Sequence, residues 1–518
     1  MRLYVLATVI ALAGLIFLAP AGPSQPRPAY ADPVACEDLD DPGLFLNTSV
    51  VTAEMLAAPV PHCRVEAYID PTGESNIGIE VRLPIPEDWN GKFLALGGGG
   101  WSGSFSGAFG TGLGRGYATV STDTGHKSGD PTQENWQLNP DNTPADNRIE
   151  DFNWRSLEQM TIIGKAIVQA HYDDTIDLSY WQGCSTGGRQ GMLLSQRYPE
   201  FYDGMIVGAP VFTTLLQVNG LWRNSFTTVP NVFLTTADQD MVVAQILDRY
   251  DALDGVEDGF LGDPERVHDW SADDIVGLPE DKVNIFANLY QGAHQTGGTQ
   301  VYFGYAIGGE RQWDGARSFS INNFGAVMLR NLVKHDPTYD VLDWDIDTDL
   351  EAFLNAPNLA TYNADDPDIR EFVANGGKMI MYHGWNDDGP NPYSTIDYYN
   401  QVEEIVGKDK DLKTGNPGSP AERVRESVRL FMAPGMDHCG GGPGVAPSAA
   451  NLLTALEMWV EGGDAPDRII ARNNAQGFER PLCPYPEVAL YTGEGDTTDA
   501  GNFICVAASG VGAGSQGQ

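Results

Sequence analysis

Cationic residues are scarce in this sequence. Only 31 of its 518 residues are Lys or Arg, whereas 71 are Asp or Glu, so the formal net charge is −40 at pH 7. A chain with this charge repels phosphate backbones and anionic headgroups, which makes nucleic acids and membrane surfaces poor partners. The acidity favours solubility but carries no information about the fold.

Hydrophobic runs long enough to cross a membrane are also lacking. An apolar stretch from Leu3 to Leu18 follows Arg2 and precedes the small-residue sequence Ala29-Tyr30-Ala31. The stretch is shorter than the ~20 residues of a spanning helix, and the layout is typical of a cleavable signal peptide. We therefore expect residues 1–31 to be removed, and the mature protein to be secreted to the periplasm or the extracellular space without a membrane anchor.

Cysteine is sparse, and no two cysteines form a C-x-x-C pair, which disfavours a zinc site. All six cysteines follow residue 31, at Cys36, Cys63, Cys184, Cys439, Cys483 and Cys505. An even number of cysteines in an exported chain favours three disulfides.

Two parts of the chain alternate strand-like and helix-like segments. The first part has strands within 77–100 and at 117–120, 180–182 and 204–207, and helices at about 156–172 and 191–197. The second part has strands at 378–382 and 428–432, and helices at 395–406 and 449–460. This alternation predicts an α/β fold with a mostly parallel sheet covered by helices.

The alternation lapses between these two parts, where the sequence is irregular, aromatic and acidic. We predict an inserted lid domain over 212–375, within a catalytic domain formed by 32–211 and 376–507. The last residues, 508–518, are rich in Gly and Ser, which predicts a disordered tail.

Residues Gly183-Cys184-Ser185-Thr186-Gly187 fit the pattern G-x-S-x-G, between a predicted strand and a predicted helix. In α/β-hydrolases this pattern forms a strained strand-to-helix turn that exposes the serine hydroxyl above the sheet, and small flanking residues make the turn possible. Taken alone, the pattern fits a glycine-rich turn that only starts a helix equally well.

An acid and a histidine follow Ser185 in the chain order expected of such enzymes. Asp387 comes after the strand at 378–382, and His438 comes after the strand at 428–432. Parallel α/β sheets place their sites at the carboxyl ends of the strands. We therefore predict an α/β-hydrolase fold in which His438 is the general base for Ser185 and Asp387 orients the imidazole.

Two cysteines adjoin these residues, because Cys184 precedes Ser185 and Cys439 follows His438. A disulfide requires Cα atoms within ~7 Å, so a bond between these two cysteines would hold the serine and the histidine close together. An ordinary stabilising crosslink is the alternative interpretation.

Two backbone N–H groups are candidates for an oxyanion hole. The first belongs to Thr186, directly after the serine, and the second to the loop Gly97 to Gly100 at the end of an early strand. Glycine allows the backbone to approach a developing oxyanion closely. The sequence leaves open which glycine donates and whether the loop is only a flexible turn, and we take Gly98 as the candidate.

An acidic loop lies in the predicted lid, from Asp251 to Phe260. Its carboxylates crowd around two glycines, and hard oxygen ligands of this kind suit Ca²⁺. The spacing differs from that of an EF-hand, so a solvated acidic turn explains the loop equally well.

These features and several further motifs resemble the tannase and feruloyl esterase family, over most of the mature chain. The matching motifs are Trp89-Asn90-Gly91-Lys92-Phe93, Gly97 to Gly100, Gly116-Tyr117-Ala118-Thr119, Asp123-Thr124-Gly125-His126, Gly183 to Gln190, Pro434-Gly435-Met436 and His438-Cys439-Gly440-Gly441.

The resemblance implies that Cys184-Ser185, Asp387 and His438-Cys439 form the catalytic unit. It also favours Asp387 over Asp388 as the acid, since Asp388 stands where the family often has proline. Disulfides Cys36–Cys63 and Cys483–Cys505 are further implied. So is a structural calcium ion in the lid, with no organic cofactor; its implied ligands are the side chains of Asp251, Asp254 and Asp258 and the carbonyls of Val256 and Phe260.

Taken together, these features predict hydrolysis of a small-molecule aromatic carboxylic ester, of feruloyl, galloyl or terephthaloyl type, through an acyl-enzyme. The substrate class rests on the resemblance and the chemistry on the site. An alternative from another class is a non-catalytic, secreted, calcium-dependent binding protein on a hydrolase scaffold. A secreted serine peptidase is a weaker third hypothesis.

Overall fold

The computed structural model describes residues 33–41, 43–128, 135–227, 232–313, 319–410, 412 and 418–508. The predicted signal peptide at 1–31 lies outside these residues, as does all of the predicted tail except residue 508. No helix in the described part of the chain combines the length and the apolarity that crossing a membrane requires.

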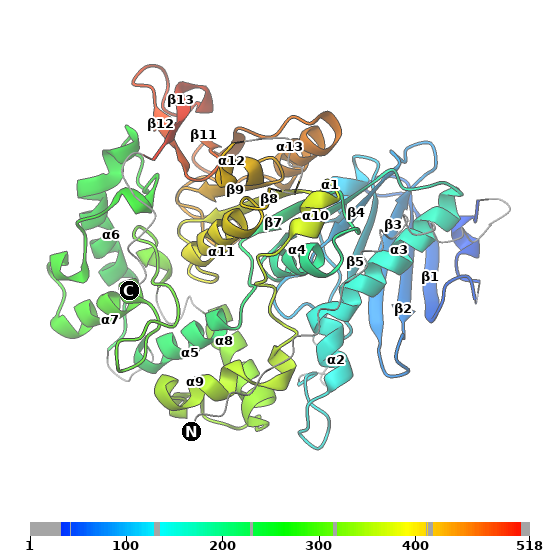
Figure 1. Cartoon of the computed structure of the whole chain (residues 1–518), viewed down its shortest axis with the longest axis horizontal. Helices are drawn as coiled ribbons and strands as arrows, with labels where there is room; N and C mark the ends of the chain where they lie inside the picture. Colours follow the sequence, from blue (N-terminus) through cyan, green and yellow to red (C-terminus); the bar gives the residue numbers. More distant parts are fainter. Residues whose placement is uncertain are drawn as a thin grey trace, which may run out of the picture.

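A nine-stranded sheet lies at the centre of the fold (Figure 1), in the spatial order β1-β2-β3-β5-β4-β6-β7-β8-β9. Neighbours from β5 through β9 in this order run parallel, and β1, β2, β3 and β5 pair antiparallel. The strands are β1 Thr48–Leu56, β2 His62–Ile69, β3 Ile77–Pro84, β4 Lys92–Leu96, β5 Ala118–Thr122, β6 Leu178–Cys184, β7 Gly204–Gly208, β8 Lys378–Gly384 and β9 Val428–Ala433. The mostly parallel sheet predicted from the sequence is confirmed.

Both faces of this sheet are buried, and alternate residues of one strand enter different cores. In β4, Phe93 and Ala95 join one hydrophobic cluster, whereas Leu94 and Leu96 join the other. A strand that is buried on both faces reads as a continuous apolar run, which explains why the parallel strands were visible in the sequence.

Helices cover the two faces. Residues of α3 Ser156–Tyr172, α4 Thr186–Arg197 and α11 Pro392–Ile405 belong to the first cluster, and residues of α1 Phe109–Leu113 and α13 Ala449–Gly462 to the second. Two short helices, α2 Asp146–Glu150 and α12 Pro420–Val424, complete this part. The last described segment forms two hairpins, β10 Ile469–Asn473 with β11 Phe478–Leu482 and β12 Glu487–Tyr491 with β13 Phe503–Ala507.

A helical insertion separates β7 from β8, in the interval predicted as a lid. Its helices are α5 Leu215–Thr227, α6 Thr236–Tyr250, α7 Glu280–Gln291, α8 Phe319–Met328, α9 Ile346–Leu354 and α10 Arg370–Ala374. Its first helices lie on the opposite side of the molecule from β1 and β2 (Figure 1, green), whereas α10, just before β8, lies beside α4. The insertion contributes most residues of two further hydrophobic clusters, so much of its packing is independent of the sheet.

Candidate active site

Ser185 occupies a strained turn between β6 and α4. Its φ of 63° and ψ of −123° lie where side-chain-bearing residues are rarely found. The flanking glycines explain how the turn closes, since a Cβ on Gly183 would lie 2.4 Å from the carbonyl oxygen of Gly187. A Cβ on Gly187 would lie 2.9 Å from the carbonyl oxygen of Gly98. The pattern G-x-S-x-G therefore follows from close backbone contacts around the serine.

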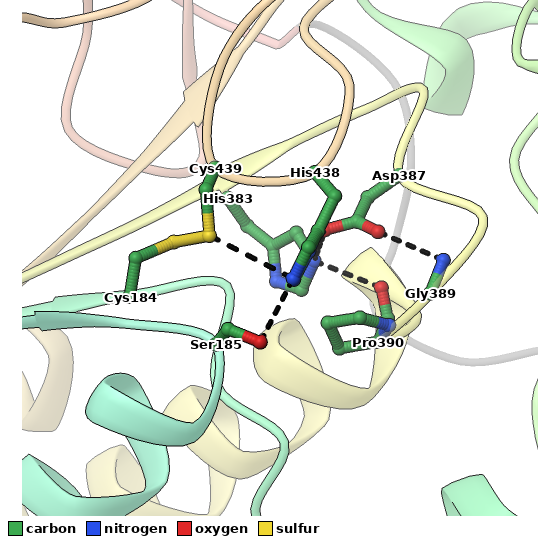
Figure 2. The surroundings of a disulfide bond; sticks show 8 residues. All are labelled: Cys184, Ser185, His383, Asp387, Gly389, Pro390, His438 and Cys439. Atoms are coloured by element: carbon green, nitrogen blue, oxygen red, sulfur yellow. Dashed lines mark hydrogen bonds and ion pairs between the residues drawn. A yellow bond between two sulfur atoms is a disulfide. The ribbon is translucent and has the colours of Figure 1, made fainter. Parts of the chain in front are cut away.

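The structure brings together Ser185 from the end of β6, Asp387 from the loop after β8 and His438 from the loop after β9 (Figure 2). His438 Nδ1 lies 2.8 Å from Asp387 Oδ2, and His438 Nε2 lies 2.9 Å from Ser185 Oγ. Because the carboxylate can only accept, Nδ1 carries the hydrogen, and Nε2 is left to accept the hydrogen of the serine hydroxyl. This is the arrangement that a general base needs beside its nucleophile.

The charges of the site favour a protonated histidine. Burial alone would raise the pKa of Asp387, but His438 and His383 stabilise its anion and lower that pKa to about 2. Burial opposes the positive charge of His438, yet Asp387, with a smaller contribution from Asp388, raises the pKa of the imidazole above its ordinary value. A proton transferred from the serine to His438 is thereby stabilised.

A disulfide joins the residues that flank the serine and the histidine. Cys184 and Cys439 are bonded with Cα atoms 6.0 Å apart, so neighbouring positions in β6 and in the loop after β9 are held together (Figure 2). The other two disulfides are Cys36–Cys63 and Cys483–Cys505, as the resemblance implied. All three expected bonds are confirmed.

His383, which received no role in the sequence analysis, also contacts the acid. Its Nε2 lies 3.0 Å from the carbonyl oxygen of Pro390 and 3.2 Å from Asp387 Oδ2, and both of these atoms are acceptors. Nε2 therefore carries the hydrogen, and Nδ1 accepts a hydrogen bond from Thr395 Oγ1 at 2.8 Å. The other carboxylate oxygen of Asp387 accepts the N–H of Gly389 at 2.8 Å, so the acid is held at both oxygens.

The choice of Gly98 for the oxyanion hole is corrected by the structure. The Gly98 N–H donates to Gln190 Oε1 at 3.0 Å and is not available to a substrate. Gly100 lines the same cavity as Ser185 and Thr186, and its N–H has no hydrogen-bond partner among the described residues. Thr186 begins α4, where the first N–H groups of a helix lack partners within the helix. Gly100 and Thr186 are therefore candidate donors in its place.

A cavity of about 240 Å³ opens beside Ser185 and His438. Its walls are largely aromatic and aliphatic, and most of them come from the insertion and the loop after β4. The side chains of this apolar wall are Trp101, Phe152, Val211, Leu216, Phe324 and Tyr362. Polar groups from Gln217 and Asp388 also line it. The size and the apolar walls suit a small organic group held next to the serine.

The acidic loop predicted to bind calcium holds its carboxylates largely within itself. Asp251 accepts the N–H of Gly259 at 3.0 Å, and Asp254 accepts the N–H of Val256 at 3.1 Å. Arg480 from β11 forms an ion pair with Asp258 at 2.5 Å. Among the described residues, no three or more His, Cys, Asp or Glu side chains are already gathered in the arrangement of a metal site. Calcium binding, including the predicted carbonyl ligands of Val256 and Phe260, stays a prediction.

The model of one protein family, described as tannase and feruloyl esterase, matches residues 63–506. The chain belongs to this family. It is therefore a carboxylic ester hydrolase, and the resemblance noted in the sequence is confirmed.

Curated relatives of the family align with nearly the whole chain. A mono(2-hydroxyethyl) terephthalate hydrolase of Piscinibacter sakaiensis is 31% identical, with 89% of this chain and 87% of the relative covered. A probable feruloyl esterase of Arthroderma benhamiae is 29% identical, with 86% of this chain and 85% of the relative covered. The similarity therefore extends to both the strands that carry the site and the insertion.

Solved structures of the family share the fold. An esterase from Aspergillus oryzae superposes with a TM-score of 0.76 at 26% identity and covers 89% of this chain and 97% of its own. A tannin acyl hydrolase from Aspergillus niger superposes with a TM-score of 0.75 at 24% identity, covering 92% of this chain and 96% of its own. The α/β-hydrolase fold predicted from the sequence is thus confirmed.

Proposed function

We propose that the protein is a secreted serine esterase that hydrolyses aromatic carboxylic esters through an acyl-enzyme. The observation that carries the proposal is the contact of Ser185 Oγ with His438 Nε2 at 2.9 Å, with Asp387 behind the imidazole. A serine hydroxyl is a weak nucleophile unless a base takes its proton, and this geometry supplies the base.

The reaction follows from these positions. Ser185 Oγ attacks the ester carbonyl carbon while His438 Nε2 accepts the hydroxyl proton, and the N–H groups of Thr186 and Gly100 stabilise the resulting oxyanion. His438 then returns the proton to the alkoxy oxygen, the C–O bond breaks and the alcohol leaves. A water molecule, deprotonated by the same imidazole, then attacks the acyl carbon. The bond from that carbon to Ser185 Oγ breaks, His438 returns the proton to Oγ, and the acid is released.

The aromatic character of the proposed acid rests on the cavity and on the relatives. Trp101, Phe152 and Phe324 supply aromatic wall beside the serine, and such walls bind flat apolar groups well. The names of the relatives refer to feruloyl and terephthalate esters. We therefore extend aromatic esters to this chain as its proposed substrates.

Secretion belongs to the same proposal. Three disulfides are formed within the described residues, and disulfides persist in oxidising compartments. The signal-like sequence at residues 1–31 precedes all of them. Expression of the full chain should release a product whose N-terminal sequence begins near Asp32, and a product that keeps residues 1–31 would contradict secretion by this route.

We further propose a structural calcium ion in the loop from Asp251 to Phe260. Asp258 Oδ1 is buried without a hydrogen-bond partner among the described residues, which leaves a hard oxygen free to bind a cation. Burial and the neighbouring Asp254 raise the pKa of Asp258 to about 7, so a further positive charge would stabilise the loop. The side chains of Asp251 and Asp254 and the carbonyls of Val256 and Phe260 would supply further oxygens.

The enzyme hypothesis is tested with a fluorophosphonate probe, which reacts with an activated serine. We expect labelling at Ser185 and loss of both labelling and ester turnover in Ser185→Ala, with an unchanged circular dichroism spectrum. A folded wild-type protein that binds aromatic esters but resists the probe would favour the calcium-dependent binding protein instead. Amide and ester versions of one substrate then distinguish an esterase from a peptidase.

A further inference from the structure

The charged part of the cavity wall is negative. Apart from the catalytic serine and histidine, the residue Thr186 and the loop at Gly100, its amide and carboxylate side chains are Gln217 and Asp388. Two donors also belong to lining residues, the Tyr362 hydroxyl, which donates to the carbonyl of Val211 at 3.3 Å, and the Trp101 indole N–H. No lysine or arginine is among the described residues that line the cavity. A group bound here meets a carboxylate and an amide, and no described cationic side chain.

Asp388 faces the cavity and is backed by a buried arginine. Its side chain keeps 18% of its surface exposed, whereas that of Arg223 keeps none. Arg223 Nη1 lies 3.5 Å from Asp388 Oδ2 and donates to the backbone carbonyl of Asp388 at 3.4 Å. Arg223 is directed elsewhere as well, because it donates to the hydroxyl of Tyr305 at 3.2 Å and to the carbonyl of Gln312 at 3.4 Å. The carboxylate is therefore the member of the pair that a ligand would meet.

The charges around Asp388 do not cancel. The groups that act on it are Arg223 from α5, Asp387 from the same loop, and Asp437 and His438 from the loop after β9. Asp387 and Asp437 add negative charge, so three carboxylates stand against one permanent cation and one imidazole. Such a cavity opposes a second anion, because charges in a partly desolvated site are poorly screened.

We propose that Asp388 is a specificity-determining residue that excludes acyl groups carrying a negative charge and favours neutral aromatic acyl groups that can donate a hydrogen bond. This inference rests on the proposed esterase function and narrows it. Of the three ester types, those with phenolic hydroxyls fit the cavity, and monoesters of a dicarboxylic acid such as terephthalate do not.

Gln217 supports the preference for a donor independently. Its side chain lines the cavity within α5 and is 1% exposed, and its Oε1 has no hydrogen-bond partner in the described part of the chain. A buried acceptor without a partner is costly, and a bound hydroxyl relieves that cost. A site built in this way discriminates strongly against analogues that lack the hydroxyl.

The test compares esters of one alcohol with three acids: 4-hydroxybenzoate, unsubstituted benzoate and terephthalate with its second carboxylate free. For each variant, kcat/KM of the terephthalate monoester is divided by that of the benzoate ester. The ratio is then compared between variants. In this comparison the intrinsic reactivities of the two esters drop out, as does any effect of a substitution on His438 that both esters share. Asp388→Asn removes the charge and keeps the shape. Asp240→Asn, which removes an exposed carboxylate paired with Arg311 in the insertion, is the matched control.

We expect Asp388→Asn to raise the ratio of anionic to neutral ester by on the order of 10- to 100-fold, and Asp240→Asn to leave it unchanged. Gln217→Leu should instead lower the preference for 4-hydroxybenzoate over benzoate by about 10-fold. A wild-type protein that prefers the terephthalate monoester, or a ratio that Asp388→Asn does not move, would overturn the proposal. If the wild-type protein hydrolyses none of the esters, the proposed function itself fails, and this inference with it.

A second measurement needs no variant. Burial raises the pKa of Asp388 to about 7 against the opposing effect of Arg223, so its negative charge grows as the pH rises from 6 to 8. The second carboxylate of terephthalate stays ionised over this range. The ratio of anionic to neutral ester should therefore fall as the pH rises in the wild-type protein. A ratio that stays flat or rises would contradict a role for the charge of Asp388.

Discussion

The disulfide between Cys184 and Cys439 allows a prediction that separates stability from catalysis. Replacing both cysteines with alanine removes a crosslink between positions 255 residues apart. The chain-entropy model assigns roughly 5.5 kcal/mol of stability to a loop of that length. The same model assigns about 3.5 kcal/mol to Cys36–Cys63, whose separation is 27 residues. The second bond is the control, because it lies at β2, away from the site.

The two double variants should differ in turnover per folded molecule as well as in stability. Without its flanking bond, the 2.9 Å contact of Ser185 with His438 depends on the turn, on Asp387 and on the hydrogen bonds of the loop after β9. A displacement of about 1 Å costs on the order of 100-fold in kcat. The Cys36→Ala/Cys63→Ala variant should keep the parental kcat. Urea unfolding gives the stability, and kcat per folded molecule is measured without denaturant. A folded Cys184→Ala/Cys439→Ala variant with the parental kcat would refute the positional role of the bond.

Three further predictions concern the acid, its second imidazole and the calcium loop. Asp387→Asn should lower kcat by about 10³- to 10⁴-fold. It should also extend the residual activity to lower pH, because the lost carboxylate no longer raises the pKa of His438 against burial. An acid limb of the pH profile that does not move would contradict this. His383→Leu should lower kcat by about 10-fold. It should also move the acid limb of the pH profile to higher pH, because Asp387 Oδ2 then interacts with the imidazole of His438 and no longer with that of His383. A change in KM alone would indicate a different role for His383. Removing calcium with EGTA should lower the melting temperature of the wild-type protein by several degrees. In Asp258→Asn, EGTA should leave the melting temperature unchanged. Equal melting curves of the wild-type protein with and without EGTA would argue against a bound calcium ion.

Much of the site could be predicted because its parts stand at fixed places on a parallel sheet. Asp387 and His438 each follow an apolar strand that is buried on both faces, and such strands are easy to recognise. Ser185 carries a local pattern whose glycines are required by close contacts. Chain order then connected three segments far apart in the sequence.

Other features depend on contacts that leave no spacing in the sequence. The N–H of Gly98 is taken by Gln190, which lies 92 positions away, so the choice among the loop glycines could not be made. Arg223 and Asp388 meet across 165 positions. His383 stands only four positions before Asp387 in the sequence, but its contact with Asp387 depends on how the loop folds back beside α11.

The prediction of the fold was also incomplete, both where strands are weakly buried and where packing outweighs helix propensity. Strand β1 is half exposed at the edge of the sheet, so its apolar pattern is faint. Helix α4 begins at Thr186, whereas the sequence predicted its start near Gly191. The glycines of its first turn lower its helix propensity, but they are required where the helix packs closely on neighbouring backbone. A Cβ on Gly188 would lie 2.3 Å from the carbonyl oxygen of Gly208, so close packing outweighs the low helix propensity of glycine there.

The position of the insertion has an evolutionary consequence. It leaves the sheet at the carboxyl end of β7, after Gly208, and returns at the amino end of β8, where Lys378 pairs with Gly204. The insertion thus fills a single connection between two neighbouring parallel strands, so the segment can be exchanged without changing the order of the strands that carry the serine, the acid and the histidine. Enzymes built on this plan can acquire new substrates by replacing one module, and a chimera that carries a relative's insertion should inherit the selectivity of the donor.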